Sequence, residues 1–289
     1  MIRPSALDQP AAPPRARLQF DNRYIAPLLI TTILFVGQIT FGFLEGYPKT
    51  LLAIGTSIVT EIVLSLLVYR KFPHLASAYV SGISVGIIIR SPFYWAYALC
   101  AAISIMSKYV LQVKGRHIWN PSNFGISILL FLAPLTVSSL TIQWGNSYSA
   151  MAVIWAVGTY IIWRLKRFHI CATYVVSYVV FAGLRSLLSG HPFLAELAPI
   201  TGPVYQLFIF FMITDPKSTV STRKGQMLVA FGVAAAECLF RMAGNVHAPY
   251  FALFCVGPAA NLLEIAWKAR KGKPDTDART TGGGWGPLR

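Results

Sequence analysis

Ionisable side chains inside apolar segments are the first candidates for chemistry in this sequence. Glu61 lies within the apolar segment 49–69, and no basic residue is found within one helical turn of it. A charge in hydrocarbon is costly unless it is paired or hydrated, so we predict a proton or cation site at Glu61, with a protonated carboxyl hydrogen-bonded between helices as the alternative. Glu237 and Arg241 are four residues apart, so they share a helix face and should form an ion pair.

The other reactive residue types form no recognised catalytic or metal-binding pattern. The five histidines have no metal-ligand spacing, so we predict no metal site. No P-loop, GxGxxG or Ser/His/Asp arrangement is present, which argues against a stand-alone hydrolase, ATPase or NADH-binding enzyme. The cysteines lack a CxxC spacing and are predicted to be buried thiols at Cys100, Cys171, Cys238 and Cys255. The sequence therefore indicates no catalytic residues.

Two polar–proline pairs, Asn120-Pro121 and Asp215-Pro216, are candidates for a binding site. Proline at the first helical position has no N–H to lose, and Asn or Asp immediately before it can cap the helix. Each pair therefore predicts the start of a helix. The functional alternative is that the two helix ends converge in one ligand or ion vestibule, because inverted repeats bring their broken helices together near the pseudo-twofold axis.

Ten apolar segments are available to position these residues. Crossing a bilayer takes about 20 apolar residues, and 55% of the chain is hydrophobic while only 12% is charged. We therefore predict an all-α integral membrane protein with about ten transmembrane helices. The predicted spans are 24–44, 49–69, 75–90, 93–111, 121–137, 148–164, 168–188, 198–214, 225–243 and 247–267.

The basic residues fix the expected orientation of these spans. All but four of the 25 Lys and Arg fall on one side of the predicted membrane; the four are Lys49, Arg90, Arg185 and Arg241. Loops rich in Lys and Arg remain cytoplasmic, so both termini should be inside the cell. The net charge of +15 thus fits anionic lipid and topology better than nucleic acid. Residues 1–23 and 269–289 are predicted to be disordered cytoplasmic tails.

A division after the fifth span gives two halves of five crossings each, 24–137 and 138–268. Five is an odd number, so the second half must run upside down relative to the first, as in an inverted repeat. The short third, fifth and eighth segments contain Gly and Pro, which predicts broken or tilted helices. Weak echoes accompany the division, because Gly115 and Gly244 each precede a proline-containing helix start at the end of their half.

Several motifs of the chain resemble one family of membrane proteins, formed by the RnfD proteins of the Rnf complexes and the NqrB proteins of the sodium-pumping NADH:quinone reductases. The resemblance rests on Ser81-Gly82, Lys108, Gly115, Asn120-Pro121, Phe210-Phe211 and Thr214-Asp215-Pro216. Within that superfamily, segments 115–125, 143–145 and 215–219 are most similar to the UnbU-type proteins encoded with enediyne biosynthesis genes. The resemblance implies a ten-helix inverted-repeat fold, shared with urea-transporter-like proteins, and a role in carrying electrons from flavins across or along a membrane.

The chain departs from this family at one position. In the respiratory members, a threonine shortly before the Phe-Phe and Thr-Asp-Pro run carries FMN through a phosphoester bond. Tyr205 occupies that position here, and Thr201 lies in surroundings that do not match the acceptor pattern. We therefore predict that the chain carries no covalent FMN.

A noncovalent flavin, FMN or riboflavin, remains compatible with the sequence. Aromatic rings could stack an isoalloxazine, and broken-helix N-termini could receive its polar edge or a phosphate, although aromatics in membrane helices are mostly packing residues. The candidate cofactor-binding residues are Trp119, Asn120, Phe124, Thr201, Tyr205, Phe210, Phe211, Thr214 and Asp215.

Three function classes follow from these observations. The first is a membrane electron-transfer subunit with a noncovalent flavin or quinone, which would work with other membrane or redox subunits and would at most be a redox subunit of an oxidoreductase complex. The second is a transporter or channel-like protein for a small polar solute, ion or natural product. The third is a membrane scaffold of a larger complex. By the resemblance, the membrane would be the bacterial inner membrane.

Overall fold

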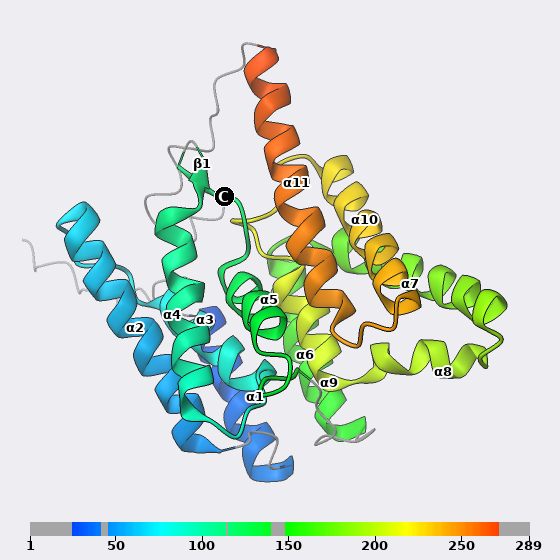
Figure 1. Ribbon diagram of the computed structural model, residues 1–289, viewed down its shortest axis with the longest axis horizontal. Coiled ribbons are helices and arrows are strands. Elements are labelled where there is room, and N and C mark those ends of the chain that lie inside the picture. Colours follow the sequence, from blue (N-terminus) through cyan, green and yellow to red (C-terminus); the bar gives the residue numbers. More distant parts are fainter. Residues whose placement is uncertain (1–24, 42–45, 114, 140–147, 272–289) are drawn as a thin grey trace, which may run out of the picture.

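The computed structural model describes residues 25–41, 46–113, 115–139 and 148–271. The predicted N-terminal tail, the 143–145 motif and residues 272–289 of the predicted C-terminal tail lie outside these ranges. The described chain is mostly helical, and its helices form a bundle with the long axes of most of them running between the same two ends (Figure 1).

The first half of the chain contains five helices and one short hairpin. Between the last two helices, the hairpin turns through Gly115, which has a φ of +76°. That left-handed conformation favours glycine. The elements are α1 (Ile25–Phe41), α2 (Tyr47–Tyr69), α3 (Ala76–Ile88), α4 (Tyr94–Val110), β1 (Gln112–Val113), β2 (Arg116–His117) and α5 (Pro121–Leu132).

The second half contains four long helices and one segment of short pieces. Those pieces replace the predicted span 198–214, and the chain bends by 67° between the two arms of the segment. Pro199 and the Gly202-Pro203 pair interrupt the helical hydrogen bonds there. The elements are α6 (Tyr148–Arg164), α7 (Phe168–Ser189), α8 (Phe193–Leu197), η2 (Ala198–Thr201), α9 (Pro203–Leu207), η3 (Phe208–Met212), α10 (Arg223–Met242) and α11 (Ala248–Arg270).

Length and composition make four of the described helices, α2, α7, α10 and α11, able to cross a membrane. The bent segment 193–212 would be a fifth, whereas α3, α5 and residues 152–164 of α6 are apolar but shorter. Large apolar side chains also cover the surface, including Leu67, Leu187 and Leu263 at 73%, 85% and 71% exposure. Patches of this extent mark a lipid or protein contact surface. The chain is therefore a multi-pass membrane protein, and ten crossings remain a prediction.

Helix packing follows the same order in both halves (Figure 1). In the first, α2 packs against α3 and α4, and α4 packs against α5; in the second, α7 packs against α8 and α10, and α10 packs against α11. The halves meet through α1 with α6 and through α5 with α11. Gly115 and Gly244 also have matching φ values of +76° and +77°, each shortly before the last helix of its half.

Glycines permit the close helix contacts of the first half. A Cβ on Gly82 would lie 2.6 Å from the Cα of Ile54, and one on Gly86 would lie 2.8 Å from the Thr50 side chain, so α3 touches the backbone of α2. Gly125 brings α5 equally near α4. Small residues at such contacts let helices in membranes pack through van der Waals interactions.

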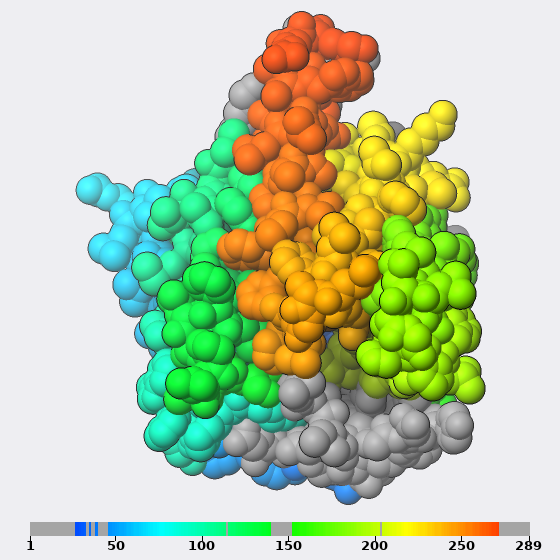
Figure 2. Space-filling view, turned by 45° about the vertical axis from the view of Figure 1, so that its right-hand side comes forward, coloured from blue at the N-terminus to red at the C-terminus, as the bar shows by residue number. Residues whose placement is uncertain are grey.

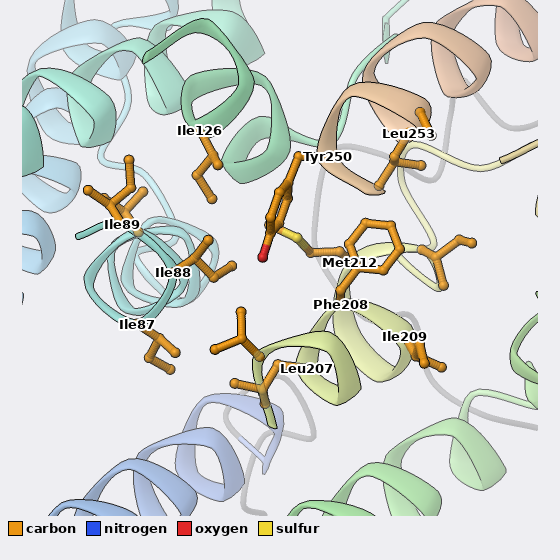
Figure 3. Close-up of a cluster of buried hydrophobic side chains, with 14 of the residues drawn as sticks. Ile87, Ile88, Ile89, Ile126, Leu207, Phe208, Ile209, Met212, Tyr250 and Leu253 are labelled. Atoms are coloured by element: carbon orange, nitrogen blue, oxygen red, sulfur yellow. The ribbon is translucent and has the colours of Figure 1, made fainter. Parts of the chain in front are cut away.

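An apolar cluster fills the centre of the molecule, where the two halves meet (Figure 3). It combines residues from the end of α3, from α5, from the α9–η3 segment and from the start of α11. The space-filling view shows the same arrangement from outside, with α11 lying between the first half on one side and α7 and α10 on the other (Figure 2). The labelled members are Ile87, Ile88, Ile89, Ile126, Leu207, Phe208, Ile209, Met212, Tyr250 and Leu253.

Two boundaries differ from the sequence prediction. α11 continues to Arg270, so residues 269 and 270 belong to the helix and not to the predicted tail; Lys268 and Arg270 in its last turn favour this extension through the helix dipole. Asp215-Pro216 does not begin a helix, because α10 starts at Arg223 with Thr222 as its cap. The physical reason is that the Asp215 carboxylate accepts hydrogen bonds within its own loop and from Asn120.

Candidate functional site

Asn120 connects the two halves of the protein. As predicted, it caps α5, because its Oδ1 accepts a hydrogen bond from the backbone N–H of Asn123 at 3.1 Å. Its Nδ2 points across the molecule and donates to Asp215 Oδ2 at 3.3 Å. The two polar–proline motifs, which are 95 residues apart in sequence, thus converge, although only Asn120-Pro121 begins a helix.

Asp215 organises the loop between η3 and α10. Its carboxylate accepts hydrogen bonds from the backbone N–H of Lys217 at 3.2 Å and from Ser218 Oγ at 2.7 Å, and its backbone oxygen accepts from Thr219 Oγ1. These bonds hold residues 215–219 in a compact turn, which competes with a helix start at Pro216. Thr214 is buried beside it, and its hydroxyl donates to the Phe210 carbonyl at 2.5 Å.

Three aromatic rings form a group next to this junction. Trp119 and Phe124 meet at a centroid distance of 5.6 Å, and Phe254 of α11 contacts them at 5.9 and 5.6 Å. The Trp119 indole N–H donates to the Phe254 carbonyl at 3.0 Å, which fixes the indole plane. Phe254 was not predicted as a site residue, because only its contact across the two halves distinguishes it from other aromatics of α11.

Two buried amides of this region, Asn123 and Asn261, have an oxygen without a hydrogen-bond partner among the described residues. Asn123 is 1% exposed, and its Nδ2 donates to the Tyr250 carbonyl at 3.1 Å. Within the part of the chain that the structure describes, its buried Oδ1 has no hydrogen-bond partner. A buried carbonyl oxygen without a donor costs about 1 to 3 kcal/mol. This amide oxygen is therefore free to accept a hydrogen bond from a buried water or from a ligand.

The hairpin clamp is the set of bonds that fastens the β1–β2 hairpin and the residues after it to the second half. Arg116 forms an ion pair with Glu264 at 3.0 Å and donates to the Thr219 carbonyl at 3.0 Å. Asn261 Nδ2 donates to the carbonyls of Ile118 and Ser218 at 3.0 and 2.7 Å. The clamp fixes the loop that carries Trp119 and Asn120, so the site is positioned by both halves.

Glu61 lies on α2 in the first half, near the β1–β2 hairpin. Its carboxylate accepts from Lys108 Nζ of α4 at 2.8 Å and from the Tyr109 hydroxyl at 3.1 Å. The ion pair is buried, with 5% and 11% side-chain exposure. The basic partner comes from another helix, which sequence spacing does not reveal. The role of Glu61 in an ion pathway remains a prediction, now for a paired carboxylate.

Tyr205 belongs to a different cluster in the second half. Its hydroxyl and that of Tyr174 both donate to the carboxylate of Glu237, which is fully buried. Arg241 Nε lies 2.8 Å from the same carboxylate, which confirms the predicted ion pair, and its guanidinium lies 5.6 Å from the centre of the Tyr205 ring. We call Tyr174, Tyr205, Glu237 and Arg241 the glutamate cluster.

The remaining predicted residues are separate from the Asn120–Asp215 junction or serve packing. Thr201 is exposed, and its hydroxyl donates to the Ala198 carbonyl at 2.7 Å. Phe210 packs against Gly158 of α6, where an added Cβ would lie 2.6 Å from its ring, and Phe211 packs partly buried against the apolar core. Among the described residues, no ring contact joins these phenylalanines to the aromatic group at Trp119. The predicted stacking residues therefore do not form one platform.

His117 makes the region around the hairpin sensitive to pH. Burial, together with the nearby charges of Lys217 and Lys108, lowers its pKa to about 4, against smaller opposing effects of Asp215 and Glu61. An unfolded histidine has a pKa of about 6.5. Between these two values the unfolded chain takes up a proton that the folded chain does not, so stability is lost as the pH falls.

We therefore expect the melting temperature to fall between about pH 7.5 and about pH 5.5, with His117 contributing about 1 kcal/mol to the lost stability. The His117→Gln variant lacks the titrating group and should show a shallower decline. Thermal unfolding of detergent-purified protein, followed by intrinsic fluorescence at both pH values, measures the difference. Equal slopes for the two proteins would contradict this assignment.

The apolar helices make this chain a multi-pass membrane protein, and the partly buried Asn120–Asp215 junction is a candidate site at the contact of its two sequence halves. Comparison with protein families then gives a match to the model of the NQR2, RnfD, RnfE family over residues 143–265. The matched range includes Tyr205, Asp215 and Glu237. It supports a relationship to the RnfD/NqrB superfamily of membrane subunits of electron-transport complexes. A comparison with curated proteins gives no match.

Proposed function

We propose that this chain is a membrane subunit of an electron-transfer complex and that it holds a flavin noncovalently at the Asn120–Asp215 junction. The observation that carries the proposal is the buried, unpartnered Asn123 Oδ1 beside this junction, in the part of the chain that the structure describes. The pyrimidine edge of an isoalloxazine presents an N–H between two carbonyl oxygens, so it suits a site with amide oxygen and amide N–H groups. The bound flavin would supply redox chemistry, and the protein would supply binding and orientation.

The aromatic group gives this proposal a second support. Trp119, Phe124 and Phe254 are partly buried; Trp119 and Phe124 lie within one turn of Asn120 and Asn123 in sequence, and Phe254 of α11 packs against both rings. The Trp119–Phe254 hydrogen bond and the hairpin clamp hold these groups before any ligand arrives. Such preorganisation reduces the entropy lost on binding. A quinone, which has carbonyl oxygens but no N–H edge, would leave Asn123 Oδ1 unpaired, so flavin is favoured.

The glutamate cluster supports the absence of covalent FMN. Tyr205 stands where the related proteins are expected to have the flavin-bearing threonine, and its hydroxyl donates to Glu237 while its ring lies under Arg241. A hydroxyl so engaged, on an aromatic side chain, is a poor acceptor for a phosphoester. We therefore propose that the redox group of this chain is held without a covalent bond.

The apolar centre argues against the transport alternative. A polar solute or ion crossing between the halves would need groups that replace its water, whereas the described centre is lined by residues such as Ile88, Ile126, Phe208 and Met212. The scaffold alternative has no specific observation in its favour. We retain ten crossings in two inverted halves, with cytoplasmic termini in a bacterial inner membrane and a place in the UnbU-like branch, as parts of the proposal.

The test is the visible absorbance of the purified protein. We expect the oxidised-flavin spectrum in protein isolated in mild detergent, release of the flavin on denaturation, and no flavin adduct in the intact mass. Trp119→Ala and Asn123→Leu should lower the flavin content at least several-fold, because they remove a stacking surface and the free acceptor. Phe231→Leu, on the exposed surface of α10, serves as the control. Colourless protein that cannot be reconstituted with flavin would refute the proposal.

A further inference from the structure

Pro258 is buried in the interior of α11. The other prolines of the described helices lie in the first turn of their helix, where the missing N–H is not needed. In a helix interior, proline removes the hydrogen bond to the carbonyl four residues earlier, and its ring pushes against that carbonyl. Both effects act on Phe254. Pro258 therefore opens the α11 backbone at this residue and creates an acceptor there.

The Trp119 indole uses the acceptor that the proline creates. Its Nε1–H donates to the Phe254 carbonyl oxygen at 3.0 Å, although the two residues belong to different halves of the chain. In a regular helix, the backbone N–H of residue 258 would donate to the same oxygen. The carbonyl that Pro258 frees is thus the one that fixes the indole.

Hydrogen bonds to the loop that enters α5 lie on both sides of this proline. Before it along α11, Phe254 accepts from Trp119; after it, Asn261 Nδ2 donates to the Ile118 carbonyl at 3.0 Å. Ile118 and Trp119 are adjacent, so one short stretch of the loop is held on α11 across the proline. Proline sets the direction of a helix at its own position. Both bonds therefore depend on Pro258.

We propose that Pro258 is the positioning residue of the Trp119 ring, and that it controls flavin affinity through this ring. Its effect on flavin rests on the proposed function, whereas the coupling between the proline and the indole N–H does not. An indole has one donor and no acceptor, so its single hydrogen bond decides how the ring is oriented. In Pro258→Ala, a backbone N–H competes for the Phe254 carbonyl and α11 straightens, so the ring is no longer held.

The first experiment is a double-mutant cycle in the full chain, measured by thermal unfolding in detergent. Trp119→Phe keeps an aromatic ring and removes the N–H. With Pro258 present, it leaves the Phe254 carbonyl without either donor, so the melting temperature should fall by several degrees. In the Pro258→Ala background, the restored N–H serves this carbonyl, and the same substitution should lower the melting temperature by less than half as much. Equal losses in the two backgrounds would overturn the proposal.

Two further variants keep the cycle decisive. Pro258→Gly restores the same N–H with a weaker helix preference, so it should also reduce the cost of Trp119→Phe. Pro249→Ala is the matched control, because Pro249 lies in the first turn of α11, where no earlier carbonyl of the helix needs its N–H. The cost of Trp119→Phe should be unchanged in this background. A similar reduction with Pro249→Ala would mean that helix preference, and not the freed carbonyl, produces the coupling.

Riboflavin binding is the second readout, measured by quenching of flavin fluorescence on the full chain. Pro258→Ala should weaken binding at least about threefold, because the ring is no longer preorganised. In the Trp119→Ala background, Pro258→Ala should have no further effect, since the proline acts through the ring. Unfolding coupling in a protein that binds no flavin refutes the proposed function and leaves the link between Pro258 and Trp119 standing. Flavin affinity unchanged by Pro258→Ala refutes the positioning role.

Discussion

Glu237→Ala is expected to be the most destabilising substitution in the glutamate cluster. It leaves the Arg241 guanidinium without its carboxylate and removes the acceptor of the Tyr174 and Tyr205 hydroxyls. Glu237 is fully buried, so water does not replace the lost carboxylate. Removing one partner of a buried ion pair typically costs about 3 to 5 kcal/mol. We expect little monodisperse protein after extraction and a melting temperature lower by many degrees. Fluorescence-detected size exclusion of heated membranes measures both.

A double substitution distinguishes the stranded charge from simple loss of packing. Glu237→Gln with Arg241→Met keeps an acceptor for the tyrosines and removes the cation, so it should recover much of the stability lost in Glu237→Ala. Arg241→Met alone should be less stable than the double variant, since it leaves the carboxylate uncompensated. If Glu237→Ala melts within a few degrees of the unmodified protein, the cluster contributes little to stability and this prediction is wrong.

Gly125→Val is expected to prevent correct packing of α5 on α4. A Cβ at Gly125 would lie 2.1 Å from Ser104 Oγ and 2.6 Å from the Cys100 carbonyl oxygen. Ser104 can rotate, but the carbonyl belongs to the backbone of α4, so the helices must separate. Overpacking typically costs about 1 to 3 kcal/mol, and contact with backbone should place this variant at or above the upper end. Because α5 carries Asn123 and Phe124, flavin content should fall together with thermal stability.

Gly55 gives a matched control for this prediction. It is also a glycine within an apolar helix, but an added Cβ would meet nothing within 4 Å. Gly55→Ala should therefore keep the unmodified melting temperature or raise it slightly, because alanine favours the helix by about 1 kcal/mol. Parallel measurement of expression, melting temperature and flavin content separates a steric effect from a general intolerance of glycine replacement. Normal stability of Gly125→Val would mean that α4 and α5 lie farther apart than described.

The features that sequence predicts well here are local ones. Apolar length located nearly all the helices, and the four-residue spacing of Glu237 and Arg241 predicted an ion pair, because one helix fixes both side chains. Asn120 was predicted as a cap from its place before Pro121. By contrast, Lys108 is 47 residues from Glu61, so no local pattern connects them.

Most of the candidate site depends on contacts between the halves, which sequence spacing does not encode. From the sequence, the Asn120–Asp215 contact was only one of two alternatives. Phe254 was missed because the ring that it contacts, Phe124, lies on another helix. Asp215 failed as a helix start because its carboxylate had nearer donors in its own turn and a further donor in the other half. Tertiary bonds thus overrode a correct local preference.

The hairpin clamp has a consequence for the order of biosynthesis. Chains are made from the N-terminus, and early segments fold first; the hairpin and α5 are therefore synthesised long before α11. Yet Arg116, Trp119 and Asn123 find their partners on α11, at Glu264, Phe254 and Tyr250. Until the last helix is in place, Arg116 lacks its carboxylate partner and Trp119 and Asn123 lack these carbonyl acceptors, so the hairpin clamp can be completed only in a chain that the ribosome has carried through α11.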